Sequence, residues 1–83
     1  MDLPGKYEVL IITLSDRASR GEYEDQSGPE VQERLSDFFT THTWNFNIER
    51  ALIPDDSSVL GRLLEEAKDK FNIIITTGGT GIG

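Results

Sequence analysis

The sequence predicts an α/β fold with three layers, in which helices cover both faces of a mostly parallel sheet. Residues 9–14 form a continuous apolar and β-branched run, which is typical of a strand buried on both faces. Strand-like and helix-like stretches then alternate in the order β-α-β-α-β, which favours right-handed crossovers between parallel strands. The 83 residues suffice for one small domain.

The first half of the chain is expected to contain a loop and a long helix after this strand. Residues 15–26 are polar and include Gly21, which predicts a long loop. Ser27 and Glu30 have the spacing of a capping box, and Pro29 fits a first helical turn, so we expect Ser27 to be the N-cap. The apolar residues that follow share one helical face: Val31, Leu35, Phe38 and Phe39.

The second half repeats the alternation of strand and helix. A period of two in the apolar residues Phe46, Ile48 and Leu52 predicts an outer, half-exposed strand. Pro54 ends this strand, and the aspartates after it are good N-caps. The next helix has an apolar stripe made of Val59, Leu60, Leu63, Leu64 and Ala67. Residues 71–77 form a third strand, whose isoleucines at 73–75 indicate a buried, central position.

Composition excludes several classes of function. Eight basic and fifteen acidic residues give a net charge of -7, which argues against a nucleic-acid-binding protein. The absence of cysteine excludes disulfides and thiolate chemistry. The longest purely apolar stretch, residues 9–12, is too short to span a membrane, and the first residues lack the pattern of a signal peptide. We expect a cytoplasmic protein that binds small molecules and neither nucleic acid nor membrane.

Three polar or glycine-rich segments follow the three predicted strands directly. Because parallel strands end at one edge of a sheet, these segments should meet there, where ligands bind in such folds. The last segment either cradles an anion with its backbone N–H groups or is an ordinary tight turn. It lacks the lysine of a P-loop and the spacing of a dinucleotide fingerprint. The segments are Ser15-Asp16-Arg17, Pro54-Asp55-Asp56 and Gly78-Gly79-Thr80-Gly81.

Each charged side chain in these segments has a functional and a structural interpretation. Asp55 and Asp56 could bind Mg²⁺, which prefers carboxylate and phosphate oxygens, or one of them could simply cap the following helix. Asp16 could bind a metal or a hydroxyl group, and Arg17 could bind an anion. The alternative for this pair is a solvated salt bridge in the loop.

Taken together, these segments resemble a known family. Residues 15–19, with Gly21, Tyr23, Asp25, Ser27 and Gly28 after them, resemble the first loop of the molybdopterin adenylyltransferase family of molybdenum cofactor biosynthesis. Residues 52–56 resemble its proline-aspartate segment, and residues 74–81 resemble its threonine-glycine signature. Order, spacing and strand context agree from about residue 7 to residue 83.

The resemblance implies an activity and roles for residues. Family members transfer the adenylyl group of Mg-ATP to the terminal phosphate of molybdopterin and release pyrophosphate, and they are typically homotrimers. By position, Asp55 matches the aspartate that the family requires for catalysis, and its role would be to position Mg²⁺ or a substrate phosphate. The first loop would lie near the substrate through Ser15, Asp16 and Arg17. The last segment would contact phosphates through Gly78, Gly79, Thr80 and Gly81.

The chain departs from the family pattern at two places. Asp56 stands where the family usually has glutamate, which shortens one side chain. The family also continues past the glycine loop with a proline-arginine-aspartate-threonine-proline stretch, whose aspartate is important for catalysis, whereas this sequence stops at Gly83. We therefore expect residues 1–83 to be a partial domain with little adenylyltransferase activity alone. The alternative is an inactive fragment, or a module that binds pterin or has a structural role.

Overall fold

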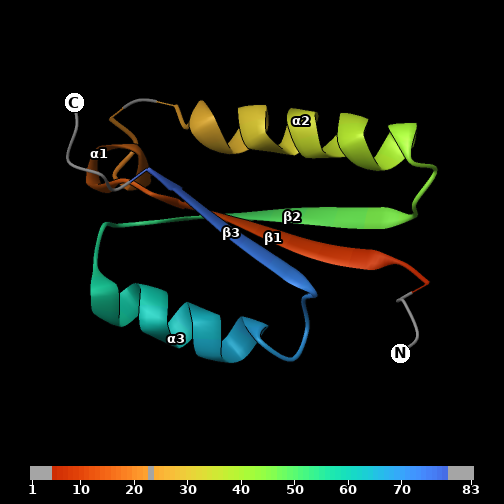
Figure 1. Cartoon of the computed structure of the whole chain (residues 1–83). Coiled ribbons are helices and arrows are strands. Elements are labelled where there is room, and N and C mark those ends of the chain that lie inside the picture. The colour runs from red at the N-terminus through yellow and green to blue at the C-terminus, as the bar shows by residue number, and fades with distance from the viewer. Residues whose placement is uncertain (1–4, 23, 79–83) are drawn as a thin grey trace.

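The computed structural model describes residues 5–22 and 24–78 and contains a three-stranded sheet between helices. Its elements in chain order are β1 (Tyr7–Leu14), α1 (Asp16–Ser19), α2 (Ser27–Thr41), β2 (Phe46–Ile53), α3 (Ser57–Ala67) and β3 (Ile73–Gly78). The strand order is β2-β1-β3 and both pairs are parallel. Helix α2 covers one face of the sheet and α3 covers the other (Figure 1). The predicted three-layer α/β architecture is confirmed.

The central strand β1 divides the core into two halves. Val9 and Ile11 are fully buried and pack around Phe39 of α2. Ile12 is fully buried on the other face, where it lies in a cluster with Ala67 at the end of α3. Because successive side chains of a strand point to opposite faces, a strand between two helices must be apolar at every position. This explains the unbroken apolar run in the sequence.

The two outer strands differ from the expectation in detail. Strand β2 lies at an edge and is half-exposed, as predicted, but Leu52 is 41% exposed although Phe46 and Ile48 pack against the core. Strand β3 lies at the other edge of the described sheet, so among the three described strands β1, and not β3, is central. The isoleucines at 73–75 are only partly buried, because one neighbouring strand and parts of two helices cover them.

The segment between β1 and α2 is more ordered than a loop, and its cap is not the one expected. Residues 16–19 form the short helix α1. At the start of α2, Oδ1 of Asp25 accepts hydrogen bonds from the Gly28 N–H at 3.2 Å and from the Ser27 hydroxyl at 3.3 Å. Oδ2 of Asp25 accepts a hydrogen bond from the hydroxyl of buried Thr13 at 2.9 Å. Asp25 therefore does the capping that the sequence assigned to Ser27, and it ties α2 to β1.

Candidate active site

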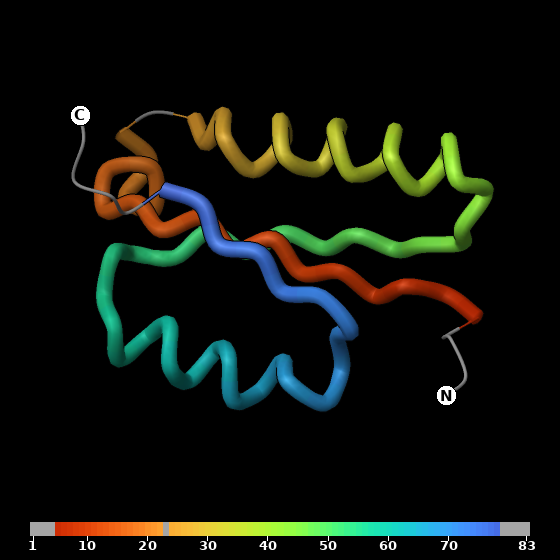
Figure 2. The backbone as a smooth tube through the Cα atoms, in the orientation of Figure 1, coloured from red at the N-terminus to blue at the C-terminus, as the bar shows by residue number. Residues whose placement is uncertain are grey.

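The carboxyl ends of the three strands meet in register. Leu14, the last residue of β1, is paired with Ile53 of β2 and with Gly78 of β3. The next residue, Ser15, donates its backbone N–H to the Ile53 carbonyl at 3.0 Å. In Figure 2 the three strand ends lie together beside the turn of α1. The predicted convergence is confirmed for residues 15–17, residues 54–56 and Gly78, whereas Gly79, Thr80 and Gly81 lie outside the described residues.

Ser15 and Asp16 build the first turn over this edge. The Ser15 hydroxyl accepts a hydrogen bond from the Ala18 N–H at 3.2 Å, so Ser15 is the N-cap of α1. The Ser19 hydroxyl donates to the Asp16 carbonyl at 2.9 Å at the other end of the turn. These contacts fix α1 so that the Asp16 side chain reaches the segment that follows β2.

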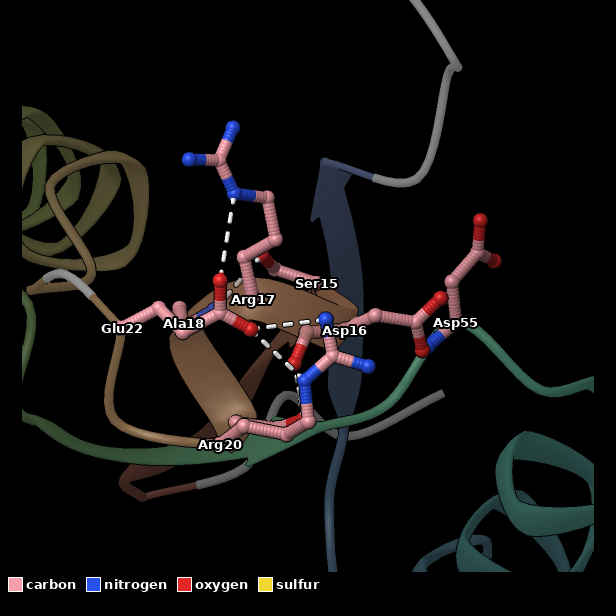
Figure 3. Close-up of polar contacts among 8 residues, drawn as sticks. Ser15, Asp16, Arg17, Ala18, Arg20, Glu22 and Asp55 are labelled. Atoms are coloured by element: carbon pink, nitrogen blue, oxygen red, sulfur yellow. Dashed lines mark hydrogen bonds and ion pairs between the residues drawn. The ribbon is translucent and has the colours of Figure 1, made fainter.

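A hydrogen bond joins the first and second strand-end segments. The backbone N–H of Asp55 donates to Oδ1 of Asp16 over 2.9 Å, although the two residues are 39 positions apart in the sequence (Figure 3). The sequence brought the two segments to one edge but did not indicate this contact, because it depends on the register of β1 with β2. Asp16 thus contacts the backbone of the residue that the family resemblance identifies as catalytic.

The two neighbouring aspartates have different roles in the structure. Asp56 is the N-cap of α3, and its Oδ1 accepts hydrogen bonds from the N–H groups of Ser58 at 2.8 Å and Val59 at 3.3 Å. The Asp55 carboxylate has no hydrogen bond or ion pair within residues 5–22 and 24–78, and Figure 3 shows it directed away from Asp16. Asp56 therefore serves the helix, while Asp55 presents an exposed carboxylate.

Arg17 takes part in an exposed ion-pair network. Its Nε lies 3.7 Å from Oε1 of Glu22, and Nη2 of Arg20 lies 2.7 Å from Oε2 of the same glutamate (Figure 3). The Arg17 side chain is 70% exposed. Ion pairs this exposed contribute little to stability, so the salt bridge predicted as the alternative exists but does not hold Arg17 strongly.

Gly78 has a backbone that requires glycine. Its φ angle is +80°, and a Cβ built at this position would lie 2.6 Å from the carbonyl oxygen of Leu14. Residues with a side chain rarely adopt such angles, and a neighbouring backbone atom cannot move easily. The need for a turn explains glycine at position 78 without any ligand. It does not bear on residues 79–81.

Comparison with known proteins identifies the family. Residues 10–83 match the family model described as a probable molybdopterin binding domain. The chain belongs to this family. It is 37% identical over 82 residues to a molybdopterin adenylyltransferase of Pyrococcus furiosus, a match that covers 98% of the chain and 45% of the relative. It is 38% identical over 75 residues to the molybdopterin adenylyltransferase of Escherichia coli K12, covering 88% of the chain and 37% of the relative.

A solved structure has the same fold. The chain resembles the tungsten cofactor synthesizing protein MoaB of Pyrococcus furiosus with a TM-score of 0.67 and 36% identity, over 98% of the chain and 48% of that protein. The likeness confirms the α/β fold, and the family model covers all three strand-end segments. The chain spans less than half the length of these curated relatives.

The described residues contain neither a cluster of metal-binding side chains nor a membrane-spanning helix. Within residues 5–22 and 24–78, no group of three or more histidine, aspartate or glutamate side chains is placed to hold a metal ion. No helix of the described part is long and apolar enough to cross a membrane.

Proposed function

We propose that the protein functions as a molybdopterin adenylyltransferase in molybdenum cofactor biosynthesis. The observation that carries the proposal is the exposed Asp55 carboxylate at the edge where three parallel strands end. It is supported by family membership and by relatives that are named molybdopterin adenylyltransferases. The substrates are ATP and molybdopterin.

The reaction is an in-line transfer. An oxygen of the terminal phosphate of molybdopterin attacks the α-phosphorus of ATP, the bond from that phosphorus to the bridging oxygen of the β-phosphate breaks, and pyrophosphate leaves. Adenylylated molybdopterin is the product. Such reactions depend on positioning and on neutralisation of charge, not on covalent catalysis by the protein. Ser15, Arg17 and residues 78–81 are proposed to bind the phosphate-bearing substrates.

The donors at the site fit Mg²⁺. This ion is often held by one or two carboxylates together with substrate phosphates, and it neutralises the phosphate charge when it is bound. Asp55 offers a carboxylate without a partner in the described part of the chain, whereas one oxygen of Asp56 is occupied by the cap of α3. We therefore propose that Asp55 makes the main protein contact with the metal ion, and that Asp56 contributes less because one of its oxygens caps α3.

Assembly and location are proposed on the family resemblance alone. We propose a homotrimer when the domain is complete, as is typical of the family, and a cytoplasmic location, where ATP is available. Sedimentation equilibrium of the complete domain would test the trimer directly. A monomer at all accessible concentrations would contradict it.

A chimera tests the function. Residues 1–83 would replace the matching segment of the Pyrococcus furiosus relative, and the chimera would be incubated with Mg-ATP and molybdopterin. We expect adenylylated molybdopterin and pyrophosphate at a rate within about tenfold of the parent enzyme, equivalent to about 1.4 kcal/mol of activation free energy. Reactions without molybdopterin control for ATP hydrolysis, and the 83-residue chain measured in parallel should show little activity. A chimera that folds but makes no product would favour the pterin-binding or structural alternative.

A further inference from the structure

The backbone around Asp55 is fixed from two sides. On the side of α3, the Asp56 N–H donates to the Pro54 carbonyl at 2.8 Å, and the Asp56 carboxylate caps the helix. On the side of the first loop, the Asp55 N–H donates to Oδ1 of Asp16 at 2.9 Å. The peptide that carries the exposed carboxylate is thus held between a helix cap and an acceptor from a distant loop.

The acceptor is itself well positioned. Asp16 begins α1, its carbonyl accepts the Ser19 hydroxyl, and the preceding Ser15 N–H is bonded to the Ile53 carbonyl at 3.0 Å. The first loop is therefore attached to the end of β2 at two points, one through the Ser15 backbone and one through the Asp16 side chain. Of these two contacts, only the one from the Asp16 side chain reaches the backbone of Asp55.

We propose that Asp16 is a positioning residue: its carboxylate oxygen holds the backbone of Asp55 so that the Asp55 carboxylate faces the substrates, and Asp16 itself does not contact them. This inference rests on the proposed adenylyltransferase function. The role requires a hydrogen-bond acceptor at Oδ1 but no negative charge. A displacement of about 1 Å in a reacting or metal-binding group can lower a rate by about a hundredfold, so the contact has a catalytic consequence.

Two substitutions of Asp16 distinguish its role as a hydrogen-bond acceptor from the effect of its negative charge. Asp16→Asn keeps an oxygen that can accept the Asp55 N–H, whereas Asp16→Ala removes the acceptor. Asp37 is exposed on α2, so Asp37→Asn and Asp37→Ala are matched controls. In the 83-residue chain, amide hydrogen exchange of Asp55 should be about five- to tenfold faster in Asp16→Ala, since the lost bond is worth about 1 kcal/mol. It should change little in Asp16→Asn and in both control variants.

Kinetics of the chimera test the catalytic consequence. Asp16→Ala should lower kcat by about ten- to a hundredfold with little change in KM for either substrate, and Asp16→Asn should restore most of the loss. If Asp16→Asn is as impaired as Asp16→Ala, or if KM rises in both variants, Asp16 contacts substrate or metal and the inference is wrong while the function stands. Equal Asp55 exchange in all variants would also overturn it. An inactive unsubstituted chimera would instead refute the function.

Discussion

Replacing Gly28 by alanine should destabilise the domain, because Asp25 and Thr13 leave no room for a side chain there. A Cβ built on Gly28 would lie 2.5 Å from Oδ2 of Asp25 and 2.9 Å from the Thr13 hydroxyl oxygen. To reach ordinary contact at 3.4 Å, Oδ2 would have to move by about 1 Å. The hydrogen bond that buried Thr13 donates to it would then be lost.

The magnitude follows from the groups involved. Loss of the acceptor of a buried hydroxyl costs about 1–3 kcal/mol, and weakening the Gly28 N–H bond to the carboxylate adds about 1 kcal/mol. The better helix propensity of alanine offsets up to about 1 kcal/mol. We therefore expect Gly28→Ala to lower the free energy of unfolding by about 2 kcal/mol, which corresponds to a fall in Tm of about 8–16 °C for a domain of this size.

Equilibrium unfolding in urea, followed by fluorescence of the single tryptophan, Trp44, measures this change. The matched control is Gly61→Ala in α3, where an added Cβ meets nothing within 4 Å and should stabilise the domain by about 0.5–1 kcal/mol. In an Asp25→Ala background, the same Gly28→Ala change should cost less than it does in the unsubstituted chain, because the carboxylate is gone and only the Thr13 hydroxyl still opposes the Cβ. If Gly28→Ala behaves like Gly61→Ala, the reasoning about the Asp25 contacts is refuted.

The remaining predictions concern the strand ends. Gly78→Ala should lower the free energy of unfolding by about 2–4 kcal/mol in the same urea experiment, because the left-handed backbone and the contact with the Leu14 carbonyl both oppose a Cβ; a loss below about 0.5 kcal/mol would contradict this. Asp56→Ala should cost about 1 kcal/mol as a lost N-cap, whereas Asp56→Ser should cost only a few tenths. Asp55→Ala should leave Tm nearly unchanged, and a large fall would mean that Asp55 supports the fold.

The strongest patterns of the sequence predicted the layers and the convergence of the strand ends. The unbroken apolar run of β1 is typical of a strand covered on both sides, and the stripe that includes Leu60 and Leu63 predicted the buried face of α3. Parallel topology then brought Ser15 and Asp55 to one edge without any knowledge of contacts. These inferences depend on the distribution of apolar residues along short segments, which the local sequence contains.

The sequence did not predict which of two side chains caps a helix, nor contacts that depend on the register of paired strands. Ser27 has the spacing of a cap, but the Asp25 carboxylate nearby is a stronger acceptor and also reaches Thr13. The bond between Asp16 and Asp55 joins residues 39 positions apart and depends on the register of two strands. The position of β3 within the described sheet depends on which strands pair with it, and the local sequence of a strand does not specify its partners.

The central claim is that Asp55 is the catalytic carboxylate at the converging strand ends and that Asp56 serves the helix. It is tested most directly by turnover of the chimera with serine at each position in turn. Serine at position 56 retains an N-cap oxygen, and the Asp55 carboxylate makes no hydrogen bond within the described residues, so neither variant should unfold. The account predicts that Asp55→Ser lowers kcat by at least about a hundredfold, or 2.7 kcal/mol, while Asp56→Ser stays within about threefold of the unsubstituted chimera. Equal losses in the two variants, or a greater loss in Asp56→Ser, would contradict it.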